Sequence, residues 1–475
     1  MDDRTPSRRA FLRYGGVVGG SALGLSAVGG SAPAGAVGGP SVASGRAALA
    51  ARRRPLRTPD SLPDPTRPAG TPTAALPFDH LVVVMMENHS FDNILGALPL
   101  VGRRAADGLT FDARGRALNT NPGPNGPVRA FPFPSTAQGN GVSQQWRATH
   151  EQVNGGRMDG FVRSAGSTRQ AMGYWTPQVL PFIYSLARTF TVADRWFGSA
   201  PCQTFPNRRF LLAGTAYGNI SSTAASLSDP PPPNGTLFDR LHQHGITWKN
   251  YYSDVPQTAV IPSIARKYPG SLARIGQFST DCASGRLPAV SLVDPQFGVV
   301  GDAGGLLQKA PGLRRLGGRL AAVGQSEEIP QDLEHGEEWA YGVVRAVLRS
   351  PAWRRTLLVY VYDEHGGYYD HVPPPAAIAP DAIPPKLAVG DPPGGYTVYG
   401  PRVPAVIVSA YSRPGAVVST VYDHTSILAT IQAKWNLPAM TFRDANAATV
   451  AACLDVRRAA FAHPPAVAPP RSLRR

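Results

Sequence analysis

The fold is decided by residues 81–86, which read Leu81-Val82-Val83-Val84-Met85-Met86. This run is apolar throughout and is bounded by polar residues, the pattern of a β-strand that is buried on both faces. Similar runs occur at 357–362 and 403–409. We therefore expect these three segments to be strands of one covered sheet.

Helical segments alternate with these strands, at 180–188, 210–212 with its flanks, 237–244, 332–348 and 426–435. This alternation predicts an α/β fold, with a mostly parallel central sheet and helices on both faces. Long Pro- and Gly-rich stretches lie between the elements, at 119–134, 229–235 and 372–396. Such connections commonly build or cover a site. Ligands of these sheets gather at the carboxyl ends of parallel strands, so the residues after each buried run are the candidates.

Composition excludes several classes of protein. The 475 residues include 43% hydrophobic residues, 50 Gly and 48 Pro, and no uninterrupted apolar run of 18 residues. General disorder and a multi-span membrane protein are therefore excluded. The formal charge is +15, but residues 1–70 contain ten Arg and four Asp, and residues 457–475 contain five Arg and no acidic residue. Because the body between these ends is nearly neutral, we expect no nucleic-acid partner, although the basic ends could touch anionic surfaces.

The N-terminus has the pattern of a targeting segment. A twin-arginine motif, Ser7-Arg8-Arg9-Ala10-Phe11-Leu12, precedes a weakly apolar, Gly-rich stretch at 14–28 and small-residue sites at 32–36. This predicts a signal peptide read by the twin-arginine (Tat) export machinery, and thus a bacterial protein that is secreted, periplasmic or on the cell surface. The alternative is a disordered, arginine-containing N-terminus.

The chain divides into four predicted parts: a signal peptide at 1–36, a Pro- and Arg-rich linker at 37–75, a catalytic domain at 76–456 and a basic disordered tail at 457–475. Three cysteines are present, and an odd number leaves at least one thiol over. If two of them pair, Cys202 with Cys282 is the favoured combination.

Oxygen-bearing side chains follow two of the buried runs. Glu87 and Asn88 come after the first run, and Asp363 and Glu364 come after the second. These oxygens suit a hard divalent cation, because crowded carboxylates need a counter-charge to stay ionised. In the alternative interpretation the acids only cap the following turns. The glycines at 366 and 367 permit a close backbone approach and favour the site.

Thr204 is a candidate nucleophile. It stands two positions before Pro206, where a helix is predicted to begin. A hydroxyl at a helix N-terminus lies where backbone N–H groups can receive phosphate oxygens, and a bound metal ion can lower its pKa. The alternative is that Thr204 only caps the helix.

Four motifs in order give a resemblance that covers residues 78–437. They are Glu87-Asn88-x-Ser90-Phe91-Asp92, the run at 154–161 (Asn-Gly-Gly-Arg-Met-Asp-Gly-Phe), Thr204-Phe205-Pro206-Asn207-Arg208, and the run at 363–375 (Asp-Glu-x-Gly-Gly-x-x-Asp-His-Val-Pro-Pro-Pro). Together they resemble the bacterial phosphoesterase family. This family contains phosphatidylcholine-type phospholipases C and acid phosphatases, and its core fold is similar to that of alkaline phosphatase.

The resemblance implies roles for individual residues. Thr204 is implied as the catalytic nucleophile that also touches one divalent metal ion, and His150 as a catalytic residue that contacts the substrate phosphate. The implied metal ligands are Glu87, Asn88, Thr204, Asp363 and Glu364. The implied substrate is a phospholipid or a small phosphoester, with possible peripheral contact to a membrane.

The chain departs from the family pattern at one place. Relatives commonly carry Asp-Asp-His-Pro before the helix that precedes the second metal strand, whereas this chain carries Glu327-Glu328-Ile329-Pro330. Ile329 cannot donate a proton to a leaving group, and His335 is the nearest histidine that follows it. His371 and His424 each follow an aspartate, and we expect both to have structural roles.

The leading hypothesis is an exported, metal-dependent phosphoric-ester hydrolase, most similar to a phospholipase C, that acts through a phosphothreonine at Thr204. The alternatives are an acid phosphatase that acts on phosphomonoesters and a non-catalytic descendant that binds phosphorylated ligands. A third interpretation, based only on composition, is a surface-binding protein anchored by its arginine-rich tail.

Overall fold

The computed structural model describes residues 55–298 and 323–474. The predicted signal peptide at 1–36 and most of the first half of the linker therefore lie outside the described residues. No helix in the described ranges is long and apolar enough to cross a membrane.

A central eight-stranded sheet organises the described chain, in the order β12-β6-β11-β10-β1-β9-β7-β8. Its strands are β1 (His80–Met86), β6 (Thr191–Ala193), β7 (Trp248–Tyr252), β8 (Leu272–Arg274), β9 (Val290–Asp294), β10 (Thr356–Tyr362), β11 (Ala405–Ser409) and β12 (Val417–Val418). All neighbours are parallel except β11, which is antiparallel to both β10 and β6. The predicted α/β fold with a mostly parallel sheet is confirmed.

The register of β1 and β10 places the candidate residues side by side. The two strands run parallel from the pair His80–Thr356 to the pair Met86–Tyr362, and every residue of β10 is buried. Because both strands end at the same level, Glu87 and Asp363 leave the sheet as neighbours. The apolar runs thus fix the place where the acidic residues meet.

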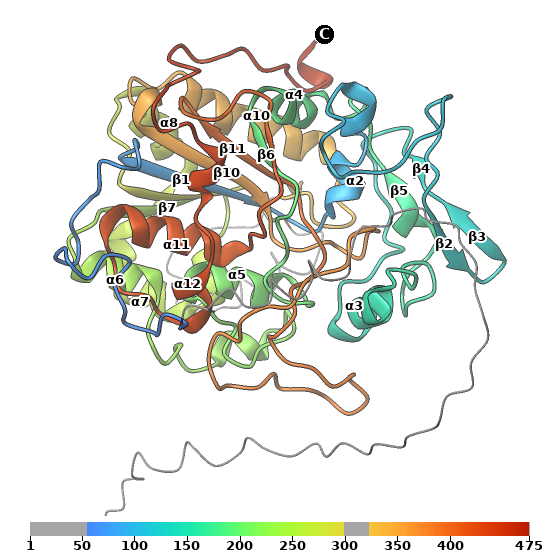
Figure 1. Ribbon diagram of the computed structural model, residues 1–475, viewed down its shortest axis with the longest axis horizontal. Helices are drawn as coiled ribbons and strands as arrows, with labels where there is room; N and C mark the ends of the chain where they lie inside the picture. The colour runs from blue at the N-terminus through green and yellow to red at the C-terminus, as the bar shows by residue number, and fades with distance from the viewer. Residues whose placement is uncertain (1–54, 299–322, 475) are drawn as a thin grey trace, which may run out of the picture. The chain divides into compact units, whose positions relative to one another are not determined.

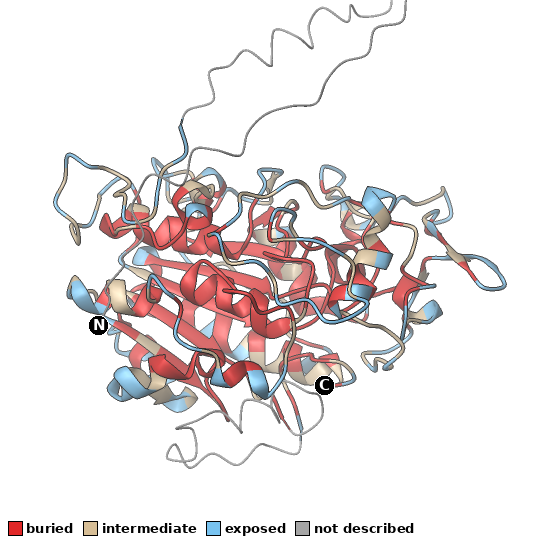
Figure 2. Cartoon of the chain, turned by 90° about the horizontal axis from the view of Figure 1, so that it is seen from below, coloured by how far each residue is buried: buried red, intermediate tan, exposed pale blue. Residues whose placement is uncertain are grey.

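Helices cover both faces of the sheet (Figure 1). One face carries α4 (Pro181–Thr189), α8 (Ile275–Ala283) and α10 (Leu333–Leu348), and the other carries α5 (Thr204–Ala213), α6 (Leu237–Gln243), α7 (Pro262–Lys267), α11 (His424–Trp435) and α12 (Phe442–Asn446). The shorter α2 (Phe91–Leu95) and α3 (Trp146–Val153) lie near the remaining small strands (Figure 1). Burial is concentrated in the sheet and the helix faces toward it (Figure 2).

The Pro- and Gly-rich stretch at 119–134 folds into a projecting hairpin rather than a plain loop. Its strands β2 (Thr120–Gly123) and β3 (Gly126–Arg129) pair antiparallel, and β4 (Phe131–Pro132) then pairs with β5 (Gly173–Tyr174). The turn between β2 and β3 is exposed (Figure 2). The hairpin precedes Gln144, whose side chain donates to Asn88.

The expectation of a disordered tail at 457–475 is wrong for its described part, 457–474. The ring of Phe461 packs 4.9 Å from that of Phe190, and the indole N–H of Trp353 donates to the Phe461 carbonyl at 2.8 Å. Phe461 is partly buried against the core, and this contact orders a segment whose composition is polar. The second half of the linker also packs on the body, where Lys434 Nζ donates to the carbonyls of Thr73 and Leu76 at 3.0 Å.

The three cysteines are all buried and unbonded. The pairing of Cys202 with Cys282 is therefore wrong. Cys202 precedes α5 and Cys282 lies in α8, and these helices cover opposite faces of the sheet (Figure 1).

Candidate active site

The loop after β1 is held in a fixed shape by buried contacts. Asn88 has a left-handed backbone with φ of 63°. Two residues later, the Ser90 hydroxyl accepts from the N–H of Asn93 at 3.1 Å, which caps α2, and donates to the Tyr369 carbonyl at 2.6 Å. Glu87 and Asn88 are fully buried. Their side chains are thereby positioned before any ligand binds.

The loop after β10 is tied directly to the loop after β1. Oδ1 of Asp363 accepts from the backbone N–H of Asn88 at 3.0 Å and from that of Glu364 at 2.7 Å. Gly366 has φ of 67°, and a Cβ there would lie 1.9 Å from the Asn88 carbonyl oxygen. Only glycine permits this close backbone approach, which the two glycines in the sequence had indicated.

Thr204 belongs to helix α5 and contacts the loop after β1. It is the first residue of α5 and is 3% exposed, and its hydroxyl oxygen accepts from Nδ2 of Asn88 at 3.1 Å. The cap position belongs to Gln203, without a capping side-chain hydrogen bond. The Thr204 hydroxyl is therefore not engaged in capping, contrary to the alternative interpretation. The carbonyl oxygen of the Asn88 amide accepts from Gln144 at 3.3 Å, which orients the amide nitrogen toward Thr204.

Arg208 joins the two acidic loops, a role that the sequence did not predict. It lies one turn after Thr204 in α5 and is fully buried. Its Nε donates to Asp363 at 3.1 Å, and its Nη2 donates to Glu87 at 3.2 Å. The sequence shows that Arg208 lies four residues after Thr204 and thus on the same face of the helix. It does not show that Arg208 is buried between two carboxylates.

The site contains more negative charge than Arg208 can neutralise. Burial raises the pKa of Glu87 well above its usual value, and the neighbouring Glu328 carboxylate raises it further. Burial likewise raises the pKa of Glu364, with Asp363 the next cause. Glu87 Oε2 and Glu364 Oε1 are buried and have no hydrogen-bond partner in the described part of the chain. Two orphaned carboxylate oxygens beside an amide and a hydroxyl fit a hard divalent cation.

Glu328 is a further carboxylate at the site. Its segment is anchored to the loop after β1, since the Glu87 N–H donates to the Ser326 carbonyl at 3.0 Å. Glu328 is 4% exposed and lies close enough to Glu87 and Glu364 to raise the pKa of both. Its neighbour Glu327 accepts from the Tyr362 hydroxyl at 2.6 Å. In the sequence, Ile329 marks the departure from the family pattern, but no local pattern marks Glu328 as part of the site.

The structure does not bring His150 into contact with the other candidates. It lies in α3, where Nδ1 is 2.7 Å from the Trp146 carbonyl, and no hydrogen bond joins it to Thr204 or Asn88 among the described residues. Burial lowers the pKa of His150. A carbonyl only accepts, so Nδ1 carries the proton and Nε2 presents its lone pair in the neutral ring. His335, in α10, forms no hydrogen bond with the site residues within the described ranges either.

A second acidic cluster lies behind the two loops but is already neutralised. Arg402 donates to Asp370 at 2.8 Å and to Asp92 at 3.2 Å, and Nδ1 of His371 is 2.7 Å from Asp92. The carboxylate oxygens of Asp92, Asp370 and the ring of His371 lie close together, but Arg402 supplies the positive charge that a metal ion would bring. His424 donates to the Asp363 carbonyl at 2.6 Å. These contacts hold both rings in place, and the structural roles of His371 and His424 stay a prediction.

The phosphoesterase family model matches residues 78–438. This chain belongs to the phosphoesterase family. The predicted family and the predicted phosphoric-ester hydrolase are confirmed at this level.

The chain is also similar to phospholipases C of plants and bacteria. The chain is 32% identical over 400 residues to non-specific phospholipase C6 of Arabidopsis thaliana, covering 78% of this chain and 71% of the relative. It is 28% identical to phospholipase C A of Mycobacterium tuberculosis, with 76% and 73% covered, and 28% identical to the non-hemolytic phospholipase C of Burkholderia pseudomallei, with 75% and 55% covered. The relatives support a phosphoesterase similar to phospholipase C.

Solved structures show a weaker likeness. A phosphonate monoester hydrolase of Agrobacterium radiobacter matches with 12% identity and a TM-score of 0.32, over 79% of this chain and 77% of that one. A protein in the alkaline phosphatase superfamily from Vibrio parahaemolyticus matches with 11% identity and a TM-score of 0.30, over 74% and 77%. With TM-scores this low, we match no residue of these structures to a residue of the candidate site.

Proposed function

We propose that this protein is an exported, metal-dependent phospholipase C that cleaves a phosphodiester through a phosphothreonine intermediate. The observation that carries the proposal is the hydrogen bond from Asn88 to the hydroxyl of Thr204 at the start of α5, beside buried carboxylates with unpartnered oxygens. The names of the relatives in plants and bacteria favour a phospholipid substrate.

In this mechanism, Thr204 attacks the phosphorus atom and becomes phosphorylated. Its oxygen is held by Asn88 and stands at the amino end of a ten-residue helix, where backbone N–H groups and the helix dipole favour phosphate oxygens. As the bond from this oxygen to phosphorus forms, the bond from phosphorus to the oxygen of the leaving alcohol breaks; water takes up the proton of the Thr204 hydroxyl and supplies one to the alcohol. Water hydrolyses the phosphothreonine and restores the hydroxyl.

The ligands proposed for one divalent cation are Glu87, Asn88, Thr204, Asp363 and Glu364, and we add Glu328 because it is buried and raises the pKa of Glu87 and Glu364. Bound there, the cation lowers the pKa of the hydroxyl and stabilises charge that develops on the phosphoryl oxygens. Asp363 already accepts from two N–H groups and from Arg208, so we assign it mainly to holding the loops in register. Glu87 and Glu364 contribute the oxygens that lack partners in the described part of the chain.

We assign His150 to the substrate phosphate. Because its Nδ1 is fixed on the Trp146 carbonyl, its Nε2 can donate to a phosphate oxygen only in the protonated ring. Burial opposes that protonation in the free protein, and an anionic phosphate would favour it. Phosphate binding and protonation of His150 are thus coupled.

The decisive experiment compares turnover of nitrophenyl phosphocholine, a diester, with that of nitrophenyl phosphate, a monoester, by purified protein with divalent cation added. A phospholipase C prefers the diester, whereas a preference for the monoester would support the acid phosphatase alternative. Saturable binding of both without turnover would support the non-catalytic alternative. Thr204→Ala serves as the blank.

The proposed location outside the cytoplasm rests on the twin-arginine motif at 7–12 alone. A location outside the cytoplasm is consistent with a phospholipid substrate at the outer surface of a membrane or in the membrane of another cell. The Tat machinery is the partner that the motif implies.

A further inference from the structure

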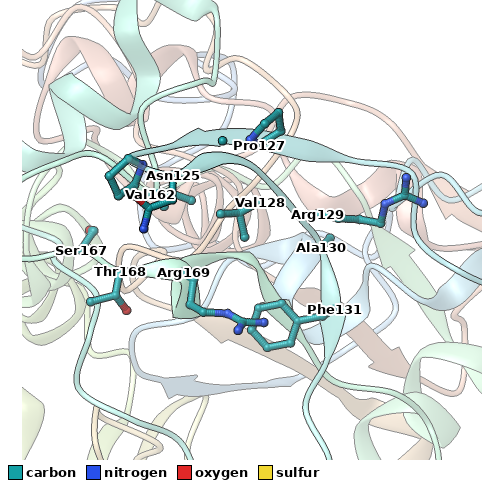
Figure 3. Close-up of a pocket in the computed structure, with 12 residues that line it drawn as sticks. Asn125, Pro127, Val128, Arg129, Ala130, Phe131, Val162, Ser167, Thr168 and Arg169 are labelled. Carbon is teal, nitrogen blue, oxygen red and sulfur yellow. The ribbon is translucent and has the colours of Figure 1, made fainter.

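A groove of about 750 Å³ lies along the β2–β3 hairpin (Figure 3). Val128 of β3 and Val162 form its apolar part, and the ring of Phe131 closes one end. The opposite wall is the segment from Ser167 to Arg169. Thr168 fixes this wall, since both its N–H and its hydroxyl donate to the Gly141 carbonyl, at 2.8 and 3.0 Å.

The groove carries positive charge without compensation. Its lining residues include Arg129 and Arg169 but no aspartate or glutamate. The guanidinium of Arg169 lies over the Phe131 ring at 4.8 Å, and that of Arg129 donates to the Ala117 carbonyl at 3.5 Å. Within the described residues, neither arginine forms an ion pair with a carboxylate. Arg163, beside the groove, likewise donates to a carbonyl, that of Gly123, at 3.1 Å.

We infer that this groove binds the headgroups of anionic phospholipids and so holds the protein on a membrane surface. The inference rests on the proposed phospholipase function. Guanidinium groups bind phosphate oxygens in a forked geometry, and apolar side chains between them accept the first carbons of the glycerol and acyl chains. The hairpin turn at 124–127 is exposed and contains two prolines and a glycine but no charge, which allows it to enter the headgroup layer.

A chain of hydrogen bonds connects the wall of the groove to the loop after β10. Ser167 of the groove wall accepts from Ser164 at 2.8 Å, and Ser164 accepts from Gln152 at 3.2 Å. The other end of Gln152 is 2.7 Å from Nε2 of His365, which adjoins Glu364. A bilayer bound at the groove would therefore lie on the segment that is hydrogen-bonded to the loop after β10.

The test is co-sedimentation of the whole protein with vesicles, one set of phosphatidylcholine alone and one containing about one third phosphatidylglycerol. Wild type is expected to bind the anionic vesicles at least tenfold more tightly, and this preference is expected to weaken with salt. Arg129→Glu with Arg169→Glu is expected to abolish the preference. The matched control is Arg286→Glu with Arg354→Glu, two exposed arginines that precede the amino ends of the central strands β9 and β10. It is expected to bind like wild type.

Further measurements separate this inference from its alternatives. Turnover of the soluble nitrophenyl phosphocholine is expected to be unchanged in the groove variant, which also reports correct folding. The milder pair Arg129→Gln with Arg169→Gln is expected to give an intermediate loss of vesicle binding. Vesicle binding without any ester hydrolysis would contradict the phospholipase proposal but not the groove. If the groove variant binds anionic vesicles as wild type does, or only Arg471→Glu with Arg474→Glu in the tail reduces binding, the inference is wrong.

Discussion

The side-chain amide of Asn88 donates a hydrogen bond of 3.1 Å to the hydroxyl of Thr204, across 116 residues of sequence. Gln144 holds the other end of the same amide, so the direction of this bond is set by the protein alone. Within residues 55–298 and 323–474 the hydroxyl makes no other hydrogen bond, so its second lone pair and its proton stay available for the reaction.

The first prediction concerns this hydroxyl. Thr204→Ala is expected to lower turnover of phosphoric esters by at least about a thousandfold, because the attacking oxygen is removed. The free energy of unfolding is expected to change by only about 1 kcal/mol, since the Thr204 hydroxyl caps no backbone group. Steady-state kinetics and urea unfolding measure the two effects.

The matched control for this prediction is Thr204→Ser, which keeps the oxygen and is expected to retain measurable activity. Acid quenching of wild type during turnover is expected to trap a phosphopeptide that contains Thr204. A near wild-type rate in the alanine variant would falsify the covalent mechanism.

The second prediction concerns the metal ion. Metal analysis of the purified protein is expected to show about one divalent ion per chain, and Glu364→Gln is expected to lower its occupancy, since Oε1 of Glu364 has no other partner among the described residues. Chelation is expected to lower the melting temperature, because the buried carboxylates lose their counter-charge. Full metal retention in a Glu87→Gln and Glu364→Gln double variant would contradict the proposed site.

Glu327 and Glu328 offer a matched pair for the same measurement. Glu328→Gln is expected to weaken metal binding, because the Glu328 carboxylate lies close to both Glu87 and Glu364. Glu327→Gln is expected to leave it unchanged, since Glu327 faces the Tyr362 hydroxyl. Equal metal affinities in the two variants would remove Glu328 from the site.

The third prediction concerns Arg208. Arg208→Met leaves Glu87 and Asp363 buried without their shared cation, and the metal-free protein is expected to lose about 3–5 kcal/mol of unfolding free energy. Added divalent cation is expected to recover part of this loss. Arg208→Lys is expected to be intermediate, because one ammonium cannot span both carboxylates. Urea unfolding with and without metal decides the matter; a methionine variant as stable as wild type would mean that Arg208 is not needed as a counter-charge.

The fourth prediction concerns pH. Burial opposes protonation of His371, but the neighbouring Asp92 carboxylate prevails and raises the pKa of His371 to about 9. Since this pKa in the folded protein exceeds the ordinary histidine value of 6.5, the contribution to stability is fully present below pH 6.5 and is lost as the pH rises through about 9. Unfolding free energy is expected to fall by about 3 kcal/mol across this window. His371→Gln is expected to flatten the profile, and an unchanged slope in that variant would assign the loss to other groups.

The fifth prediction concerns export. Replacement of Arg8 and Arg9 by Lys is expected to leave the protein in the cytoplasm, because the twin-arginine pathway recognises the guanidinium pair and not charge alone. Immunoblots of cell fractions from a bacterial host measure the outcome. Unchanged secretion would show that another signal directs the chain.

The amino-acid sequence by itself determined the buried strands and the order of the motifs. The apolar runs ending at Met86 and Tyr362 are local patterns, and a parallel pair must bring the residues after both strands to one edge of the sheet. For the same reason Glu87, Asn88, Asp363 and Glu364 could be selected from the sequence alone. The direction of β11 could not, because a buried run has the same pattern in parallel and antiparallel strands.

Only the tertiary structure decided which polar atoms have partners. The N–H of Asn88 finds Asp363 across 275 residues, and Arg208 finds Asp363 across 155. Burial and charge compensation depend on such distant contacts, so no local pattern could assign Arg208 or add Glu328 to the site. The packing of Phe461 has the same cause. Its segment is polar in composition, but Phe461 contacts Phe190 and Trp353, which are distant in the sequence. Composition alone could not predict these contacts.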